Sequence, residues 1–181
     1  MEDQSVGLKD KIRSLGWRQW KWLFLMTLLF VIIVIAIGSS SSLSTNEGEE
    51  ILENFESNLP DIATTPIFIN NFLIAVIMFI PFLGPLMGTI ILHTTGVVIA
   101  ATAMSVNLSG VWLLLGLLIF PFAWLEFISY SIAITQSIFL VIGLLRSRFK
   151  NELFRTAFLI LTVFVMLFAA AFIEAILILA L

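Results

Sequence analysis

The Lys and Arg residues of this 181-residue chain fall in two short stretches, and long apolar runs fill almost everything between them. One stretch covers residues 9–21 and the other covers residues 146–155. The acidic residues gather mainly in a third stretch, 47–61, which contains no basic residue. Basic residues segregated in this way are typical of a polytopic membrane protein, because its cytoplasmic segments carry an excess of Lys and Arg. The charge distribution therefore favours a chain that crosses a bilayer several times.

Composition leads to the same fold class. The chain is 60% hydrophobic and 12% charged, whereas soluble domains carry about 25% charged residues. The apolar runs are continuous rather than alternating, which excludes the pattern of a membrane β-barrel. The absence of cysteine excludes disulfides, a thiolate nucleophile and Cys-based metal sites. We therefore predict an all-α fold, a polytopic transmembrane helical bundle.

The number of crossings depends on how residues 111–145 are divided by Pro121. The ten residues before the proline are too few to span as a helix, so we predict that they form a re-entrant or half helix. This gives five crossings, with both basic stretches on the cytoplasmic side. The alternative is six crossings, which would put the second basic stretch on the opposite side. The five predicted crossings cover residues 22–38, 66–82, 85–104, 121–145 and 157–181.

The same topology defines four regions of a multi-pass protein of the cell membrane. Residues 1–21 are predicted as a cytoplasmic, basic, amphipathic segment, and residues 22–38 as the first transmembrane helix, an uncleaved signal anchor. Residues 39–65 form an external acidic linker with a short amphipathic helix, whose apolar face carries Ile51, Leu52, Phe55 and Leu59. Residues 66–181 form the membrane core. The N-terminus is cytoplasmic and the C-terminus external.

Polar side chains within the predicted crossings are the candidate functional residues, because an ionisable group at the centre of a bilayer costs about 2.5–3.5 kcal/mol on insertion scales. Five of them fall in the outer half of the membrane under the five-crossing topology. One interpretation is an outward-facing site for a proton, a cation or a cationic group of a partner. The other is interhelical hydrogen bonding without further function. The residues are Asn70, Asn71, Glu126, Tyr130 and Glu174.

His93 lies nearer mid-depth, and together with the two distant glutamates it offers the only conceivable metal ligands within the crossings. No HExxH or comparable spacing supports a metal site. We expect no metal and no cofactor.

Small residues recur at fourfold spacing along the crossing that starts near Pro85. Gly84 and Gly88 form a GxxxG step, and Gly96 and Ala100 continue the same face. Such a stripe lets helix backbones approach closely, so we expect this helix to be central, either packed within the bundle or at a subunit contact.

From Pro66 onward the chain resembles the stage II sporulation protein M family of membrane proteins. The resemblance covers roughly two-thirds of the sequence and rests on several blocks in the family's order. These blocks are Ile67-Phe68-Ile69-Asn70-Asn71-Phe72, the Gly84/Gly88 region, Thr95-Gly96, Pro121–Ala133 with Leu125-Glu126-Phe127, and Ala171-Phe172-Ile173-Glu174-Ala175.

Two departures from the family pattern stand out. Phe122 and Ala123 replace the His-Gly pair expected after Pro121, and Thr95 replaces an expected Asn. The resemblance implies a membrane subunit, since the family's namesake helps to localise cell-wall hydrolases during engulfment in spore-forming bacteria. Relatives also occur in archaea and in bacteria that do not sporulate.

These observations favour a non-enzymatic integral membrane scaffold or accessory subunit of a larger membrane complex. The alternative is a small transporter or channel component that uses the outer polar site. An intramembrane enzyme is a third hypothesis, with no Ser/His motif, paired aspartates or cysteine in its favour. The expected partners are the lipid bilayer and either other membrane subunits or further copies of the chain, and no nucleic acid.

Overall fold

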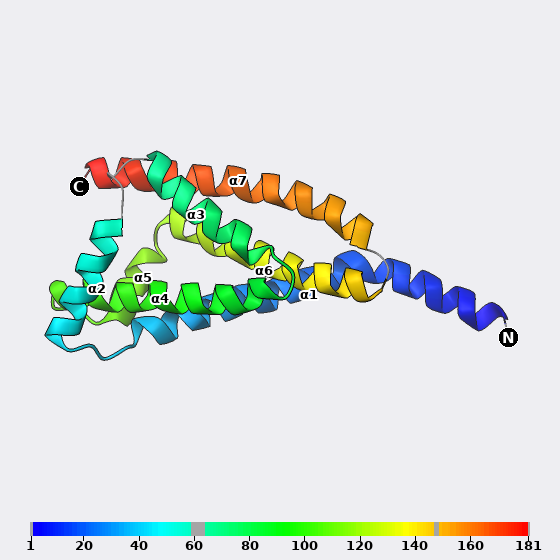
Figure 1. Ribbon diagram of the computed structural model, residues 1–181, viewed down its shortest axis with the longest axis horizontal. Coiled ribbons are helices and arrows are strands. Elements are labelled where there is room, and N and C mark those ends of the chain that lie inside the picture. Colours follow the sequence, from blue (N-terminus) through cyan, green and yellow to red (C-terminus); the bar gives the residue numbers. More distant parts are fainter. Residues whose placement is uncertain (1, 59–63, 147–148, 181) are drawn as a thin grey trace.

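The computed structural model describes residues 2–58, 64–146 and 149–180, with side chains described for residues 16–55, 64–146 and 149–178. All regular secondary structure in these ranges is helical, which confirms the all-α prediction (Figure 1). Leu59, Asp61 and Arg148 lie outside the described residues, as do the side chains of the first fifteen residues. The helices are α1 Glu2–Ser39, α2 Thr45–Asn58, α3 Thr64–Met78, α4 Leu83–Ser105, α5 Gly110–Leu117, α6 Pro121–Leu145 and α7 Phe149–Ala180.

Four of the helices are long and apolar enough to cross a membrane. They are Gly16–Ser39 within α1, the whole of α4 and α6, and Phe149–Ile178 within α7. Helix α3 is apolar but has only 15 residues, a length of about 22 Å against a hydrocarbon core of about 30 Å. Helix α5 has eight residues, too few to span, which matches the short apolar segment expected before Pro121.

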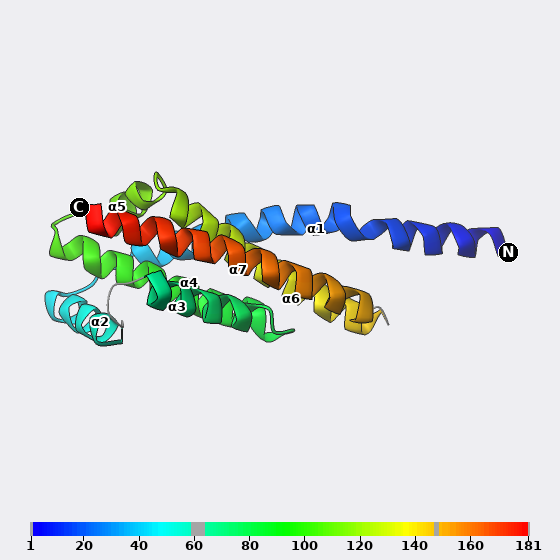
Figure 2. The ribbon, with the colours of Figure 1, turned by 90° about the horizontal axis from the view of Figure 1, so that it is seen from above.

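Five helices, α1, α3, α4, α6 and α7, lie along the long axis of the molecule (Figures 1 and 2). Helices α2 and α5 and the C-terminus gather at one end. The N-terminus and the α6–α7 connection point toward the other end, and the α3–α4 turn faces the same way. The acidic helix α2 and the described parts of the two basic stretches therefore lie toward opposite ends of the molecule.

The N-terminal segment and the first crossing form one uninterrupted helix, α1, rather than two elements with a boundary near residue 21. No proline occurs in this stretch, and an interior glycine costs a helix only about 1 kcal/mol relative to alanine. Of the tryptophans near the start of the apolar part of α1, Trp17 and Trp22 are exposed, whereas Trp20 is buried in the bundle.

The turn between α3 and α4 lies earlier than the sequence indicated. It ends at Phe82, whose φ of 65° is in the left-handed region, and α4 begins at Leu83. Gly84 and Pro85 belong to the first turn of α4, whose start precedes the predicted start of the crossing at residue 85. Proline is compatible with that position, because the N–H groups of a first helical turn have no intrahelical acceptor in any case.

The small-residue stripe of α4 faces the interior of the subunit, with Gly84, Gly88, Gly96 and Ala100 all buried. A Cβ atom on Gly96 would clash with the carbonyl oxygen of Ile35 and would lie 2.8 Å from the Cα of Gly38. All of the nearest atoms are backbone atoms of α1, so a change of side-chain rotamer on either helix cannot relieve the clash. The crossing of α1 and α4 therefore requires a glycine on both helices.

We predict that Gly96→Ala destabilises the bundle by about 1–3 kcal/mol, the usual cost of overpacking, because α1 and α4 must separate to admit the methyl group. The measurement is the thermal unfolding midpoint of the purified protein in mild detergent. Gly116→Ala is the matched control, since a Cβ at Gly116 of α5 meets nothing within 4 Å. Equal midpoints for the two variants would show that the α1–α4 crossing is not tight.

Helix α2 begins with a capping box, a reciprocal pair of side chains at its N-terminus. The backbone N–H and the hydroxyl of Ser44 donate to Glu47 Oε2 at 2.8 and 2.7 Å, and the Glu47 N–H lies 3.4 Å from Ser44 Oγ. The hydroxyl and backbone hydrogen bonds from Ser44 hold the pKa of the Glu47 carboxyl below its usual value. The buried Gly48 lies against the side chain of Met104, which places α2 on the end of α4.

The lowered pKa of Glu47 predicts how the cap responds to pH. Because the folded pKa lies below the unfolded one, the contribution of the cap is complete at neutral pH and is lost as the pH falls through the folded pKa. The Ser44 amide resonance in NMR should therefore titrate with a midpoint below 4.5, the ordinary value for a glutamate. Glu47→Gln should abolish this titration. A midpoint at or above the ordinary value would contradict the capping geometry.

Candidate functional site

A hydrogen bond between side chains joins α3 to α6 at the end of the bundle where α2 lies. Asn71 Nδ2 donates to Glu126 Oε1 at 2.7 Å, and both residues are partly buried. The two residues are separated by 55 positions in the sequence. Since Glu126 lies in the second turn of α6, the bond fixes the start of that helix against α3.

Tyr130 and Glu174 complete a cluster around this bond. Tyr130 follows Glu126 by one turn on the same face of α6, is 6% exposed, and donates no hydrogen bond to any residue that the structure describes. Glu174 of α7 lies close enough to both residues for its carboxylate to interact with them electrostatically. Four of the five residues singled out in the sequence thus meet from three helices.

The fifth predicted residue, Asn70, lies at the rim. It is exposed, and its Nδ2 atom is 3.5 Å from Asn71 Oδ1, at the limit of a hydrogen bond. We call Asn71, Glu126, Tyr130 and Glu174 the outer polar cluster.

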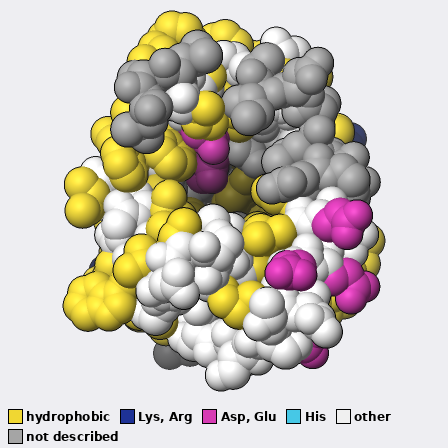
Figure 3. All heavy atoms as spheres, turned by 90° about the vertical axis from the view of Figure 1, so that its left-hand side faces the viewer, with side chains coloured by type: hydrophobic (Ala, Val, Ile, Leu, Met, Phe, Trp, Pro, Cys, Tyr) yellow, Lys and Arg dark blue, Asp and Glu magenta, His cyan; other side chains and the backbone are white. Residues whose placement is uncertain are grey.

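The outer polar cluster contains carboxylates without a basic counterpart. No Lys or Arg occurs between residues 22 and 145 or after Arg155, so no basic side chain comes from the helix segments at this end. Figure 3, which faces this end, shows acidic side chains set back in a hollow among apolar ones, with the acidic residues of α2 on the surface beside them. The arrangement can hold a proton, a cation or a cationic side chain.

The described residues offer no metal-binding group of three or more His, Cys, Asp and Glu side chains. His93, which the sequence offered as a possible companion of the glutamates, is on the exposed face of α4 and lines a separate groove with residues of α1.

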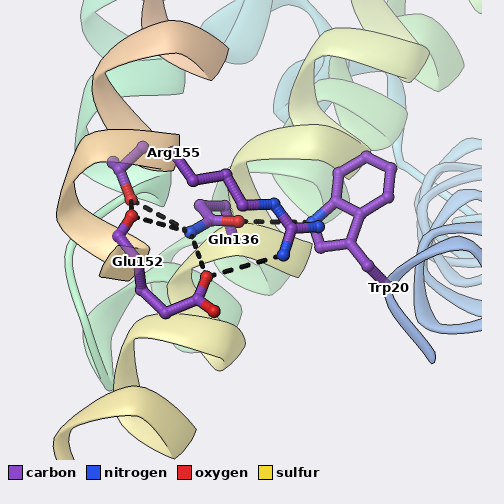
Figure 4. A network of polar contacts seen from close by, with 5 residues as sticks. Trp20, Gln136, Glu152 and Arg155 are labelled. Carbon is purple, nitrogen blue, oxygen red and sulfur yellow. Dashed lines mark hydrogen bonds and ion pairs between the residues drawn. The ribbon is translucent and has the colours of Figure 1, made fainter. Parts of the chain in front are cut away.

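A second polar network lies deep in the bundle toward the opposite end, and the sequence analysis missed it (Figure 4). Gln136 of α6 is fully buried and is its centre. Its Oε1 atom accepts from Trp20 Nε1 at 3.2 Å, and its Nε2 atom donates to Glu152 Oε2 at 3.2 Å and to Thr156 Oγ1 at 3.0 Å. The network therefore ties α1, α6 and α7 together. The signal in the sequence was a run of three polar residues, Thr135-Gln136-Ser137, within a long apolar helix.

Arg155 is enclosed by the same network rather than lying in a cytoplasmic loop, where the sequence had placed it. Its guanidinium carbon lies 4.6, 5.1 and 5.2 Å from the ring centroids of Trp17, Trp20 and Phe139. Its Nη1 atom is 3.6 Å from Glu152 Oε2, while Nε and Nη2 are buried without hydrogen-bond partners in the described structure. Cation–π attraction to aromatic faces compensates for part of that lost solvation.

We predict that Trp20→Phe lowers the free energy of unfolding by about 1 kcal/mol, because it leaves the buried Gln136 Oε1 without its donor while keeping an aromatic ring beside Arg155. Thermal unfolding in detergent measures this. Trp22→Phe is the control, since Trp22 is 61% exposed, and it should leave the midpoint unchanged. If the two variants behave alike, the indole–amide hydrogen bond does not contribute.

Comparison with known proteins identifies the family. The model of the family described as Stage II sporulation protein M matches residues 22–177, which include every described side chain of both polar networks except Trp17 and Trp20. Comparisons with curated proteins and with solved structures gave no match. Because the family match extends over most of the chain, this apolar, all-helical protein belongs to the stage II sporulation protein M family.

Proposed function

We propose that the protein is a non-enzymatic accessory subunit or scaffold of a larger complex in the cell membrane, and that the outer polar cluster is where a partner docks. The uncompensated carboxylates of Glu126 and Glu174 are the observation that carries this proposal. A carboxylate held among helices is unfavourable unless it is protonated or faces a cation. A partner that presents a Lys or Arg side chain at the outer membrane surface supplies that cation.

The proposal rests on a topology of five crossings with α5 as a half helix. In this topology the fifth crossing is made by the apolar helix α3 together with the turn through Phe82. The basic stretches then face the cytoplasm, and α2, the outer polar cluster and the C-terminus face outward. The six-crossing alternative is disfavoured by the eight-residue length of α5.

The architecture supports a docking role over catalysis. Outside the long helices, α2 is the only sizeable helix among the described residues, and it packs on the end of α4. Its exposed carboxylates lie beside the hollow of the outer polar cluster (Figure 3). A partner that approaches from outside therefore meets exposed carboxylates beside a hollow that also contains acidic side chains.

The proposal predicts that Glu126→Gln disrupts a complex without unfolding the protein. The amide keeps an oxygen that accepts from Asn71, so the α3–α6 contact survives while the charge is lost. The test is the native mass of the full chain after gentle extraction from its own membrane, with the co-purifying proteins identified. We expect one defined membrane protein with the wild type and its loss with Glu126→Gln.

Gly116→Ala, which changes neither a charge nor a packing contact, is the control and should retain the partner. Retention of the same partner by Glu126→Gln would contradict docking at the outer polar cluster. Recovery of the chain with no partner at all would contradict the subunit role.

A transporter or channel component is the second candidate. The half helix α5 ends at a break before Pro121, five residues from Glu126, and interrupted helices beside intramembrane carboxylates are used by transporters to bind ions. Ion or proton flux into liposomes that contain only this chain, abolished by Glu126→Gln, would favour this function over docking.

A further inference from the structure

Helix α4 exposes an ionisable side chain near its middle. His93 lies about as far from Leu83 as from Ser105, and α4 is one of the four helices able to span a membrane. The side chain is exposed, and its imidazole makes no hydrogen bond to any residue that the structure describes. Ionisable residues at such a depth normally face protein or water rather than lipid, because lipid offers them no hydrogen-bond partner. This face of α4 therefore requires a polar partner.

The surface around His93 is a groove between α1 and α4 with a volume of about 330 Å³. Its lining is mostly apolar, with a short polar line along α4. The hydroxyls of Thr89 and Thr94 donate to the carbonyl oxygens of Pro85 and Ile90 at 2.7 and 3.0 Å. Their oxygens remain free to accept. The lining residues are Val34, Ile37, Thr89, Ile90, His93 and Thr94.

We propose that this groove is the interface with a second copy of the chain, with the two copies inserted in the same orientation and related by a twofold axis along the membrane normal. A neutral imidazole has one donor and one acceptor nitrogen, so two of them complement each other. A copy in the same orientation brings its own His93 to the same depth. A different partner would need a polar residue of its own at that depth. A twofold contact is also the commonest form of homo-oligomer.

The packing of α4 within the subunit supports this assignment. Its small-residue stripe is already used inside the bundle, where Gly96 meets Gly38 of α1 and Gly88 meets Ile134 of α6. The GxxxG face is therefore closed to a second copy. The face that carries His93 and Thr94 remains exposed, and it combines a groove with hydrogen-bonding groups.

Cysteine cross-linking tests the interface directly, because the chain has no cysteine of its own. Thr94→Cys in lipid nanodiscs or proteoliposomes should give a disulfide-linked species with twice the mass of the chain on mild oxidation. Phe172→Cys is the control, since Phe172 is 53% exposed on α7, away from the groove, and it should stay unlinked. Equal linking of both variants, or no linking of Thr94→Cys, would overturn the proposal. Linking to a protein of another mass would overturn it in favour of a different partner.

The contribution of the histidine is measured with His93→Leu, which removes the hydrogen-bonding group from a lipid-compatible position and should leave the subunit folded. Loss of one interhelical hydrogen bond corresponds to dimerisation about 5- to 30-fold weaker. Native mass across a range of protein-to-lipid ratios measures this shift, and the thermal midpoint checks folding. Unchanged dimerisation, or a wild-type chain that is monomeric at every ratio, would contradict the role of His93.

Discussion

The contact between α1 and α4 at Gly38 and Gly96 is the one on which the rest of the arrangement depends. In lipid the hydrophobic effect does not press helices together, so close backbone packing must do so. Because the contact is backbone against backbone, it fixes the distance between the two helices without any choice of side-chain conformation. With α1 held there, Thr27 reaches Thr135 and Trp20 reaches Gln136 on α6.

The two polar networks of the bundle differ in how completely they are satisfied. At the basic end, Gln136 has hydrogen-bond partners on two neighbouring helices, and the Arg155 guanidinium has a carboxylate and three aromatic rings around it. At the acidic end, Glu126 has the amide of Asn71, but no basic side chain that the structure describes forms an ion pair with it or with Glu174. The first network holds three helices together through the hydrogen bonds of Gln136, whereas the second contains two carboxyl groups without a basic partner among the described side chains.

The proposed docking site and the proposed dimer interface use different surfaces. The outer polar cluster opens at the end of the bundle, between α3, α6 and α7, while the groove at His93 runs along its side, between α1 and α4. A partner bound at the end does not compete for space with a second copy bound at the side. The two arrangements are compatible in one assembly, which would present two acidic ends to the same side of the membrane.

The sequence by itself determined the helical class and the segregation of charge, and it predicted that Asn71, Glu126, Tyr130 and Glu174 lie in the same half of the bilayer. These follow from local chemistry, because the hydropathy of a segment and the position of a residue along it set its depth. Only the tertiary structure decided that Asn71 bonds Glu126, that Gln136 joins α1 to α7, and that Arg155 is enclosed by rings. Such pairings depend on which faces of distant helices meet. That is set by backbone contacts such as Gly38 with Gly96, which no spacing within one helix encodes.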